Sequence, residues 1–115
     1  MTGIEALFAA IPVSDLPVAI DWYSRLFGRP PDVVVHRDEV MWQATEAAWL
    51  YVVVDADRGG RGVVTLAVAD LDATLAELST RGMAGGTVLP VGTSGRRTVH
   101  TDPDGNRIAL VEISG

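Results

Sequence analysis

The stretch IPVSDLPVAIDWYS, residues 11–24, returns 55 residues later as LAVADLDATLAELS, residues 66–79. Most apolar positions of the two stretches coincide, and four positions are identical. The identical pairs are Val13 and Val68, Asp15 and Asp70, Leu16 and Leu71, and Ser24 and Ser79. A repeat at one fixed offset indicates that the chain uses one structural unit twice.

Each copy of this unit predicts a strand, a corner and a helix. Asp15 and Asp70 stand at the corners, where a carboxylate accepts hydrogen bonds from the first amides of a helix. Pro17 suits a first helical turn, and Gly28 and Gly82 are expected to end the helices. The apolar residues between these signals fall at helical spacing and predict a core-facing stripe.

Three strand-like segments follow each helix. They cover residues 31–36, 39–44 and 48–55 in the first copy, and residues 86–91, 96–101 and 107–113 in the second. The sequence DPDGN at residues 102–106 is typical of a tight hairpin turn. The order predicts an α+β fold of two tandem βαβββ modules, at about residues 4–55 and 62–113, within a single domain of residues 1–115.

Each predicted sheet has one helix, so one face of each sheet stays uncovered. We expect a curved mixed sheet that surrounds a cleft, with the helices on its outer face. The free sheet edges predict a homodimer.

Composition excludes several functions. The 115 residues include no cysteine and no lysine, which excludes thiolate metal sites, disulfides and Schiff-base chemistry. A net charge of −6 argues against nucleic acid; it suits a basic ligand, or simply solubility. The absence of a long apolar run and of a basic leader predicts a cytoplasmic protein without a membrane partner.

The repeated IPVSDLPVAIDWYSRLFG and VADLDATLAELSTRG stretches, together with DPDGNRIALVE, resemble the vicinal oxygen chelate superfamily. This group includes glyoxalases, bleomycin resistance proteins and extradiol dioxygenases, and the resemblance covers nearly the whole chain. Enzymes of the group bind a divalent metal through side chains on the first and last strands of both modules. The family forms its cleft either within one chain or between two chains, and both arrangements stay open here.

Carried over residue by residue, the family's metal-ligand positions fall on Phe8, Tyr51, Val63 and Ala109. Divalent metals need imidazole, carboxylate or similar donors, and a neutral tyrosine is a poor substitute. Glu112 lies three residues beyond Ala109, so strand alternation places it on the opposite face. Because this chain departs from the family at these positions, we expect a cleft without a metal and without any other cofactor.

The remaining candidates for ligand binding are mainly aromatic. Trp42 and Trp49 are expected to line the cleft beside Phe8 and Tyr51, although core packing or a dimer interface explains aromatic residues nearly as well. Strand parity taken from the family directs Arg97 and Val99 into the cleft. The same parity turns His100 toward the helices.

Two further features offer weaker chemistry. His36 and His100 lack matched carboxylates, and no catalytic residue is assigned. The GTSGRR stretch, residues 92–97, is either an anion-binding nest with Arg96 or Arg97 as a clamp, or an ordinary loop.

The leading functional hypothesis is a metal-free small-molecule-binding protein that sequesters a drug or metabolite, as antibiotic-resistance proteins of this superfamily do. A basic or aromatic ligand is expected. The alternative is a glyoxalase-like lyase or isomerase, or a dioxygenase, that uses the same cleft. A third hypothesis is an interaction module whose cleft is closed by its own partner.

Overall fold

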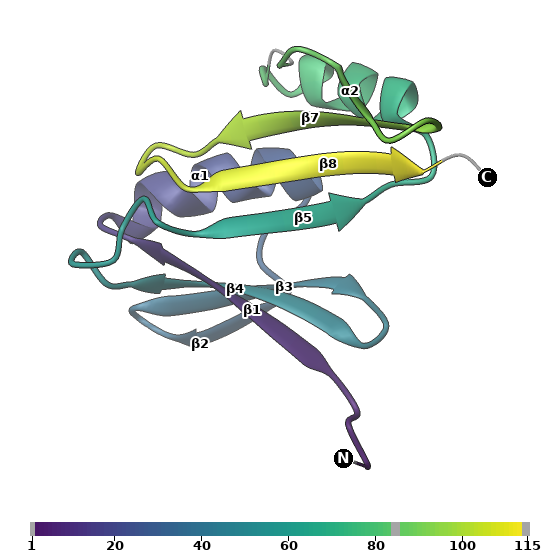
Figure 1. The fold of residues 1–115 in the computed structure, drawn as a ribbon. Coiled ribbons are helices and arrows are strands. Elements are labelled where there is room, and N and C mark those ends of the chain that lie inside the picture. Colours follow the sequence, from purple (N-terminus) through teal and green to yellow (C-terminus); the bar gives the residue numbers. More distant parts are fainter. Residues whose placement is uncertain (1, 84–85, 114–115) are drawn as a thin grey trace.

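The computed structural model describes residues 2–83 and 86–113, and it shows two βαβββ modules in tandem (Figure 1). The expected α+β class and the expected module order are both confirmed. The first module contains β1 (Leu7–Val13), α1 (Leu16–Phe27), β2 (Val33–His36), β3 (Glu39–Thr45) and β4 (Ala48–Val54). The second module contains β5 (Val63–Ala67), α2 (Leu71–Thr80), β6 (Leu89–Val91), β7 (Gly95–Thr101) and β8 (Arg107–Ile113).

The two modules form two four-stranded mixed sheets with equivalent strand orders. The first sheet has the order β1-β4-β3-β2, and the second has the order β5-β8-β7-β6. In each sheet the first strand runs parallel to the last strand of its module, and the other pairs are antiparallel. The repeat in the sequence is therefore a repeat in topology as well.

The helices begin and end at the residues that their chemistry predicts. Asp15 accepts a hydrogen bond from the Val18 amide at 3.1 Å, and Asp70 accepts one from the Ala73 amide at 3.0 Å. Each carboxylate satisfies an amide that has no partner within its helix. Gly28 ends α1 with a positive φ of 74°, a conformation that glycine adopts without strain.

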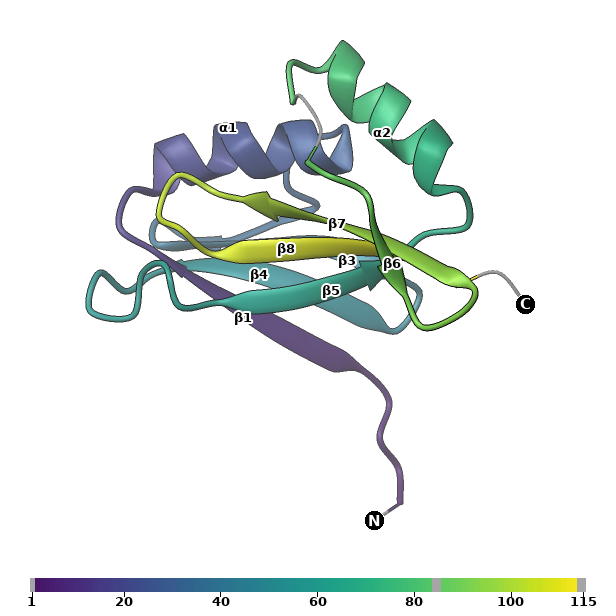
Figure 2. The ribbon, with the colours of Figure 1, turned by 45° about the horizontal axis from the view of Figure 1, so that its top comes forward.

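Both helices and both sheets share one hydrophobic core. Ile11 from β1, Tyr23 from α1, Leu71 from α2 and Ile108 from β8 belong to the same buried cluster, and all four are fully buried. Figures 1 and 2 show α1 beside both sheets. The helix-bearing faces of the two sheets thus turn toward a common core. Their opposite faces, here called the helix-free faces, point away from it.

The turn between β7 and β8 joins the two modules. The Asp102 carboxylate accepts hydrogen bonds from the Tyr23 hydroxyl at 2.8 Å, from the Asn106 side chain at 2.8 Å, and from the backbone amides of Asp104 and Asn106 at 2.9 Å. Asn106 also donates to the Pro12 carbonyl at 2.8 Å. Burial and the bond to Asp102 raise the pKa of Tyr23 far above its ordinary value. The predicted hairpin turn is therefore also an intermodule joint.

Candidate functional site

The helix-free face of the first sheet presents a stacked aromatic pair, of which Phe8 is exposed and Trp49 is half-buried. Phe8 on β1 lies directly opposite Trp49 on β4, and their rings stack with centroids 6.2 Å apart and planes 11° apart. Phe8 remains 52% exposed. Tyr51 follows two residues after Trp49 and therefore shares this face. The structure thus brings together three of the aromatic residues expected at a ligand site.

The helix-free face of the second sheet carries the remaining expected residues. Val99 on β7 lies opposite Ala109 on β8, and Arg97 lies opposite Val111, so these side chains share one face. Val63 on β5 lies at the edge of this face and is 71% exposed. Ala109 has only a methyl side chain, and the residue is 8% exposed.

Strand registers fix which residues correspond in the two modules. Phe8 pairs with Trp49, two residues before Tyr51, whereas Val63 pairs with Arg107, two residues before Ala109. Tyr51 is therefore the structural counterpart of Ala109. Only the tyrosine among the four positions Phe8, Tyr51, Val63 and Ala109 carries a polar donor atom. Within residues 2–83 and 86–113, no three His, Cys, Asp or Glu side chains gather in a metal-binding group. The side chains at these four positions do not fit the divalent metal that enzymes of the vicinal oxygen chelate superfamily bind.

A cavity of about 520 Å³ opens on the helix-free face of the first sheet, next to the linker between modules. Ala10, Pro12 and Val53 are its apolar lining residues, and Tyr51 also lines it. The linker contributes the charged residues of the wall, which are Asp55, Arg58 and Arg61. A cavity of this size, with apolar walls and a few polar groups, is suited to a small organic molecule.

The expectation that Trp42 lines the ligand face is wrong. Trp42 pairs with Leu50, so it shares the helix-bearing face of the sheet, and it is fully buried. Its ring stacks on Phe27 with centroids 5.5 Å apart, and its indole nitrogen donates to the Arg29 carbonyl at 3.0 Å. Both contacts hold the tryptophan in the core.

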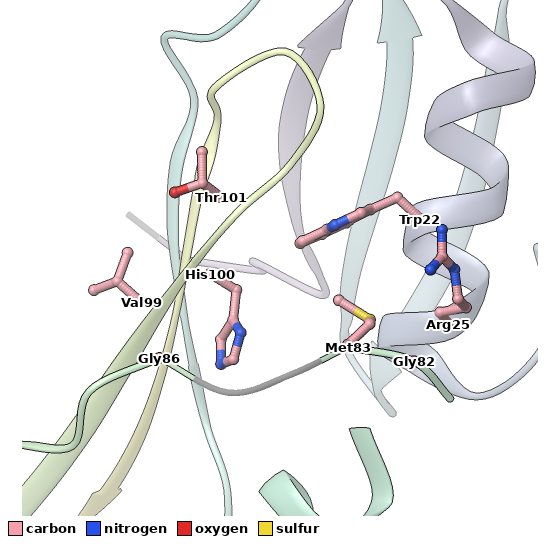
Figure 3. Close-up of a pocket in the computed structure, with 8 residues that line it drawn as sticks. All are labelled: Trp22, Arg25, Gly82, Met83, Gly86, Val99, His100 and Thr101. Carbon is pink, nitrogen blue, oxygen red and sulfur yellow. The ribbon is translucent and has the colours of Figure 1, made fainter. Parts of the chain in front are cut away.

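His100 lies on the helix side of the second sheet, as parity predicted. Only 6% of the residue is exposed, and its Nε2 lies 3.0 Å from the Thr98 hydroxyl. Burial lowers the pKa of His100 below its ordinary value. Figure 3 shows it across a separate cavity of about 340 Å³ from Trp22 and Arg25 of α1. The helix-free faces therefore contain no part of this histidine.

The two neighbouring arginines of β7 have different roles. Arg96 points to the helix side and pairs with Asp72 and Glu112, each at 3.2 Å, and these contacts raise the pKa of its guanidinium. Glu112 in turn accepts a bond from the first amide of α2 at 2.8 Å. Arg96 therefore holds α2 on its sheet, and of the two only Arg97 projects from the helix-free face. The GTSGRR stretch is a turn leading into β7.

The class of this protein follows from comparison with known families. The family model of the glyoxalase, bleomycin resistance protein and dioxygenase superfamily matches residues 6–110, and the chain belongs to this family. No curated protein is similar enough to match.

Solved structures give more particular likenesses. A glyoxalase/bleomycin resistance protein from Catenulispora acidiphila DSM 44928 is 36% identical over 95% of this chain and 98% of its own, with a TM-score of 0.89. TnmS3, an antibiotic binding protein from Streptomyces sp. CB03234, is 26% identical over 99% of this chain and 98% of its own, with a TM-score of 0.75. A glyoxalase/bleomycin resistance protein from the same Streptomyces strain is 30% identical over 92% and 97% of the two chains, with a TM-score of 0.69.

Sequence reasoning missed the charged wall of the 520 Å³ cavity. Arg58 and Arg61 lie in the linker, where no periodicity indicates what a side chain faces. Their position is determined by the path of the chain from β4 to β5. The only signal in the sequence was the pair of arginines in the glycine-rich stretch DADRGGRG, residues 55–62. Within the described residues, no helix has the length and apolar character that crossing a bilayer requires.

Proposed function

We propose that this protein binds a flat aromatic small molecule on its helix-free faces without a metal, and that it protects by sequestering this drug or metabolite. The observation that carries the proposal is the exposed stack of Phe8 on Trp49, which borders a cavity lined by Tyr51. An exposed aromatic pair on a sheet offers a planar ligand a stacking surface. The similarity to TnmS3, an antibiotic binding protein, supports the same class of function.

We further propose that two copies complete the binding cleft. The helix-bearing faces of both sheets converge on one core, so the helix-free faces of one chain point away from it. Phe8 and Val63 are exposed on these faces, which is costly for large apolar side chains in contact with water. A second copy of the chain would cover them, and the first sheet of one copy would then face the second sheet of its partner.

The assembly is tested by the molecular mass in solution. Sedimentation equilibrium should give a dimer for the unchanged chain and a monomer for the Phe8→Glu/Val63→Glu variant. Val34→Glu is the matched control, because Val34 is 70% exposed on β2 but lies outside the helix-free faces. A monomeric unchanged protein, or a control variant that also dissociates, would contradict the proposed two-copy cleft.

The absence of metal chemistry is tested by elemental analysis of the purified protein, followed by calorimetric titration with zinc, nickel and ferrous ions. The donor-poor positions Phe8, Tyr51, Val63 and Ala109 predict no stoichiometric metal and no tight binding. A tightly bound, stoichiometric metal would contradict this mapping. It would favour the alternative function, a lyase, isomerase or dioxygenase.

Ligand binding is tested by a thermal-shift screen of planar aromatic compounds. The hits should lose their effect in Trp49→Ala, because one wall of the stack is removed, and should keep it in Trp22→Phe, which leaves the helix-free faces intact. Naphthalene-based compounds are a useful starting set because their rings match the stacked pair in size. A screen without hits, or hits whose thermal shift is unchanged in Trp49→Ala, would argue against the proposed site.

A further inference from the structure

The arginines of this chain divide into two groups by their contacts. Six of the nine arginine side chains make an ion pair or a hydrogen bond within the described part of the chain. Arg25, Arg29, Arg37, Arg58 and Arg96 pair with carboxylates, and Arg81 donates to backbone carbonyls of α1. The other three are Arg61, Arg97 and Arg107. Within residues 2–83 and 86–113, their side chains have no ion pair and no hydrogen bond.

These three arginines all lie on the helix-free faces or in the cavity beside them, and those of the second sheet meet the aromatic stack only across the proposed two-copy cleft. Arg61 lines the 520 Å³ cavity beside Tyr51. Arg97 lies opposite Val111, and Arg107 lies opposite Val63, so both project from the helix-free face of the second sheet. All three are exposed to solvent.

Carboxylates are scarce on the same faces. The described strands of the second sheet place no Asp or Glu on their helix-free face, because Glu112 points to the helix side, where it meets Arg96. Among the described strand residues of the first sheet, Glu39 is the one acid on this face, and it lies at the end of β3 near His36. Asp55 lies at the cavity wall, where Arg58 pairs with it at 3.7 Å.

The local charge of the site is therefore opposite to the charge of the whole chain. The net charge of −6 comes mainly from helices, turns and loops, whereas the cavity of the first sheet and the helix-free face of the second sheet hold the three arginines without an ion pair among the described residues. An ionic ligand responds most strongly to charges within about 10 Å at physiological salt, so acids farther away count for less than the arginines of the site. Asp104, which lies beside Gly59, already accepts a hydrogen bond from the Ser14 amide.

We infer that the ligand is an aromatic anion, a planar ring system that bears a carboxylate or a similar acidic group, and that Arg61, Arg97 and Arg107 recognise its charge. This inference rests on the proposed function and specifies its ligand class. It replaces the basic ligand that the net charge of the sequence favours. The ring lies on Phe8 and Trp49, and the acidic group meets guanidinium groups, which bind carboxylates through paired N–H donors.

Three probes of equal ring size separate the inference from the proposed function. They are 2-naphthoate, 2-naphthylmethanol and 2-naphthylmethylammonium, which are anionic, neutral and cationic at neutral pH. Affinity is measured by titration of the ¹⁵N-labelled full chain, monitored through amide and arginine Nε shifts. We expect 2-naphthoate to bind about tenfold more tightly than the alcohol and the ammonium compound to bind most weakly, with the advantage of the anion shrinking as salt is added.

Charge-matched variants assign the effect to the site. Arg61→Gln and Arg97→Gln should each reduce the affinity for 2-naphthoate several-fold, about fivefold, and leave the affinity for 2-naphthylmethanol unchanged. Arg37→Gln changes the net charge equally, but its side chain is 94% exposed in the turn between β2 and β3, so it should leave both affinities unchanged.

The outcomes are distinct. Binding of the alcohol or the ammonium compound as tightly as 2-naphthoate would overturn the inference and leave aromatic binding intact. Equal losses in Arg37→Gln and Arg61→Gln would show a general charge effect and also overturn it. Failure of all three probes to bind would instead count against the aromatic site of the proposed function.

Discussion

Substituting Asp102 by asparagine should show how strongly the β7–β8 turn joins the modules. The carboxylate is 4% exposed and accepts four hydrogen bonds, two on each oxygen. An asparagine has one acceptor oxygen. If that oxygen keeps the two backbone amides, the new NH₂ group faces the side chains of Tyr23 and Asn106.

The magnitude follows from these two contacts. The Tyr23 hydroxyl can rotate and accept from the new NH₂ group, so this contact is weakened but kept. The Asn106 NH₂ group then meets another donor and loses a hydrogen bond to a carboxylate, which is worth about 1.5–3 kcal/mol. Adding the weaker Tyr23 contact, we expect Asp102→Asn to lower the free energy of unfolding by about 2–4 kcal/mol. Tyr23→Phe removes one bond and leaves three, so it should cost about 1–2 kcal/mol.

The measurement is urea unfolding at neutral pH, followed by far-ultraviolet circular dichroism and tryptophan fluorescence together. Both probes should move in one transition, and the double variant should lose less than the sum of the single losses because the two residues share a bond. Equal stability of Asp102→Asn and the unchanged protein would refute the role of the turn as a joint. So would strict additivity of the two substitutions.

Two further predictions concern stability. Because burial lowers the pKa of His100, the folded state favours the neutral ring. The contribution of the neutral ring to the free energy of unfolding is complete above the unfolded pKa of about 6.5 and is lost as the pH falls through the folded pKa. His100→Gln should therefore reduce the fall in melting temperature between about pH 7.5 and about pH 5. Equal pH profiles for the variant and the unchanged protein would contradict this. Gly60 and Gly92 both have positive φ, but a Cβ at Gly60 would collide with the Asp104 carbonyl, whereas Gly92 has open space. In denaturant unfolding Gly92→Ala should cost about 1–2 kcal/mol and Gly60→Ala about 1–3 kcal/mol more, and equal costs would show that the turn shifts to accommodate the methyl group.

The fold was predictable because its signals are local and occur twice. Asp15 and Asp70 cap the helices through contacts three residues away, and alternation along β7 places Arg97 and Val99 on one face without knowledge of any partner strand. Trp42 shows the limit of such reasoning. The face on which it lies depends on the register between β3 and β4, and this register shifts between Gln43 and Thr45. Counting alternate residues back from the hairpin therefore assigns Trp42 to the wrong face.

The candidate site was predictable only where it lies on regular strands. Phe8 and Tyr51 were placed by the positions carried over from the resembling family, whereas Arg61 takes its place from a linker whose path depends on packing between Gly60 and the β7–β8 turn. The sign of the charge at the site was also out of reach. Net charge is a property of the whole composition, and the contacts that engage six of the nine arginines become visible only in three dimensions.

The joint between the modules also bears on how this chain can be divided. A fragment that ends in the linker would keep Tyr23 and the Pro12 carbonyl but lose the carboxylate and the amide that satisfy them, together with the core residues Ile108 and Leu110 of β8. Neither half is then a self-sufficient folding unit, despite the internal repeat. Two fragments expressed together would supply each other's missing contacts, so reassembly of the cut chain becomes a direct report on contacts made at Asp102 and Asn106.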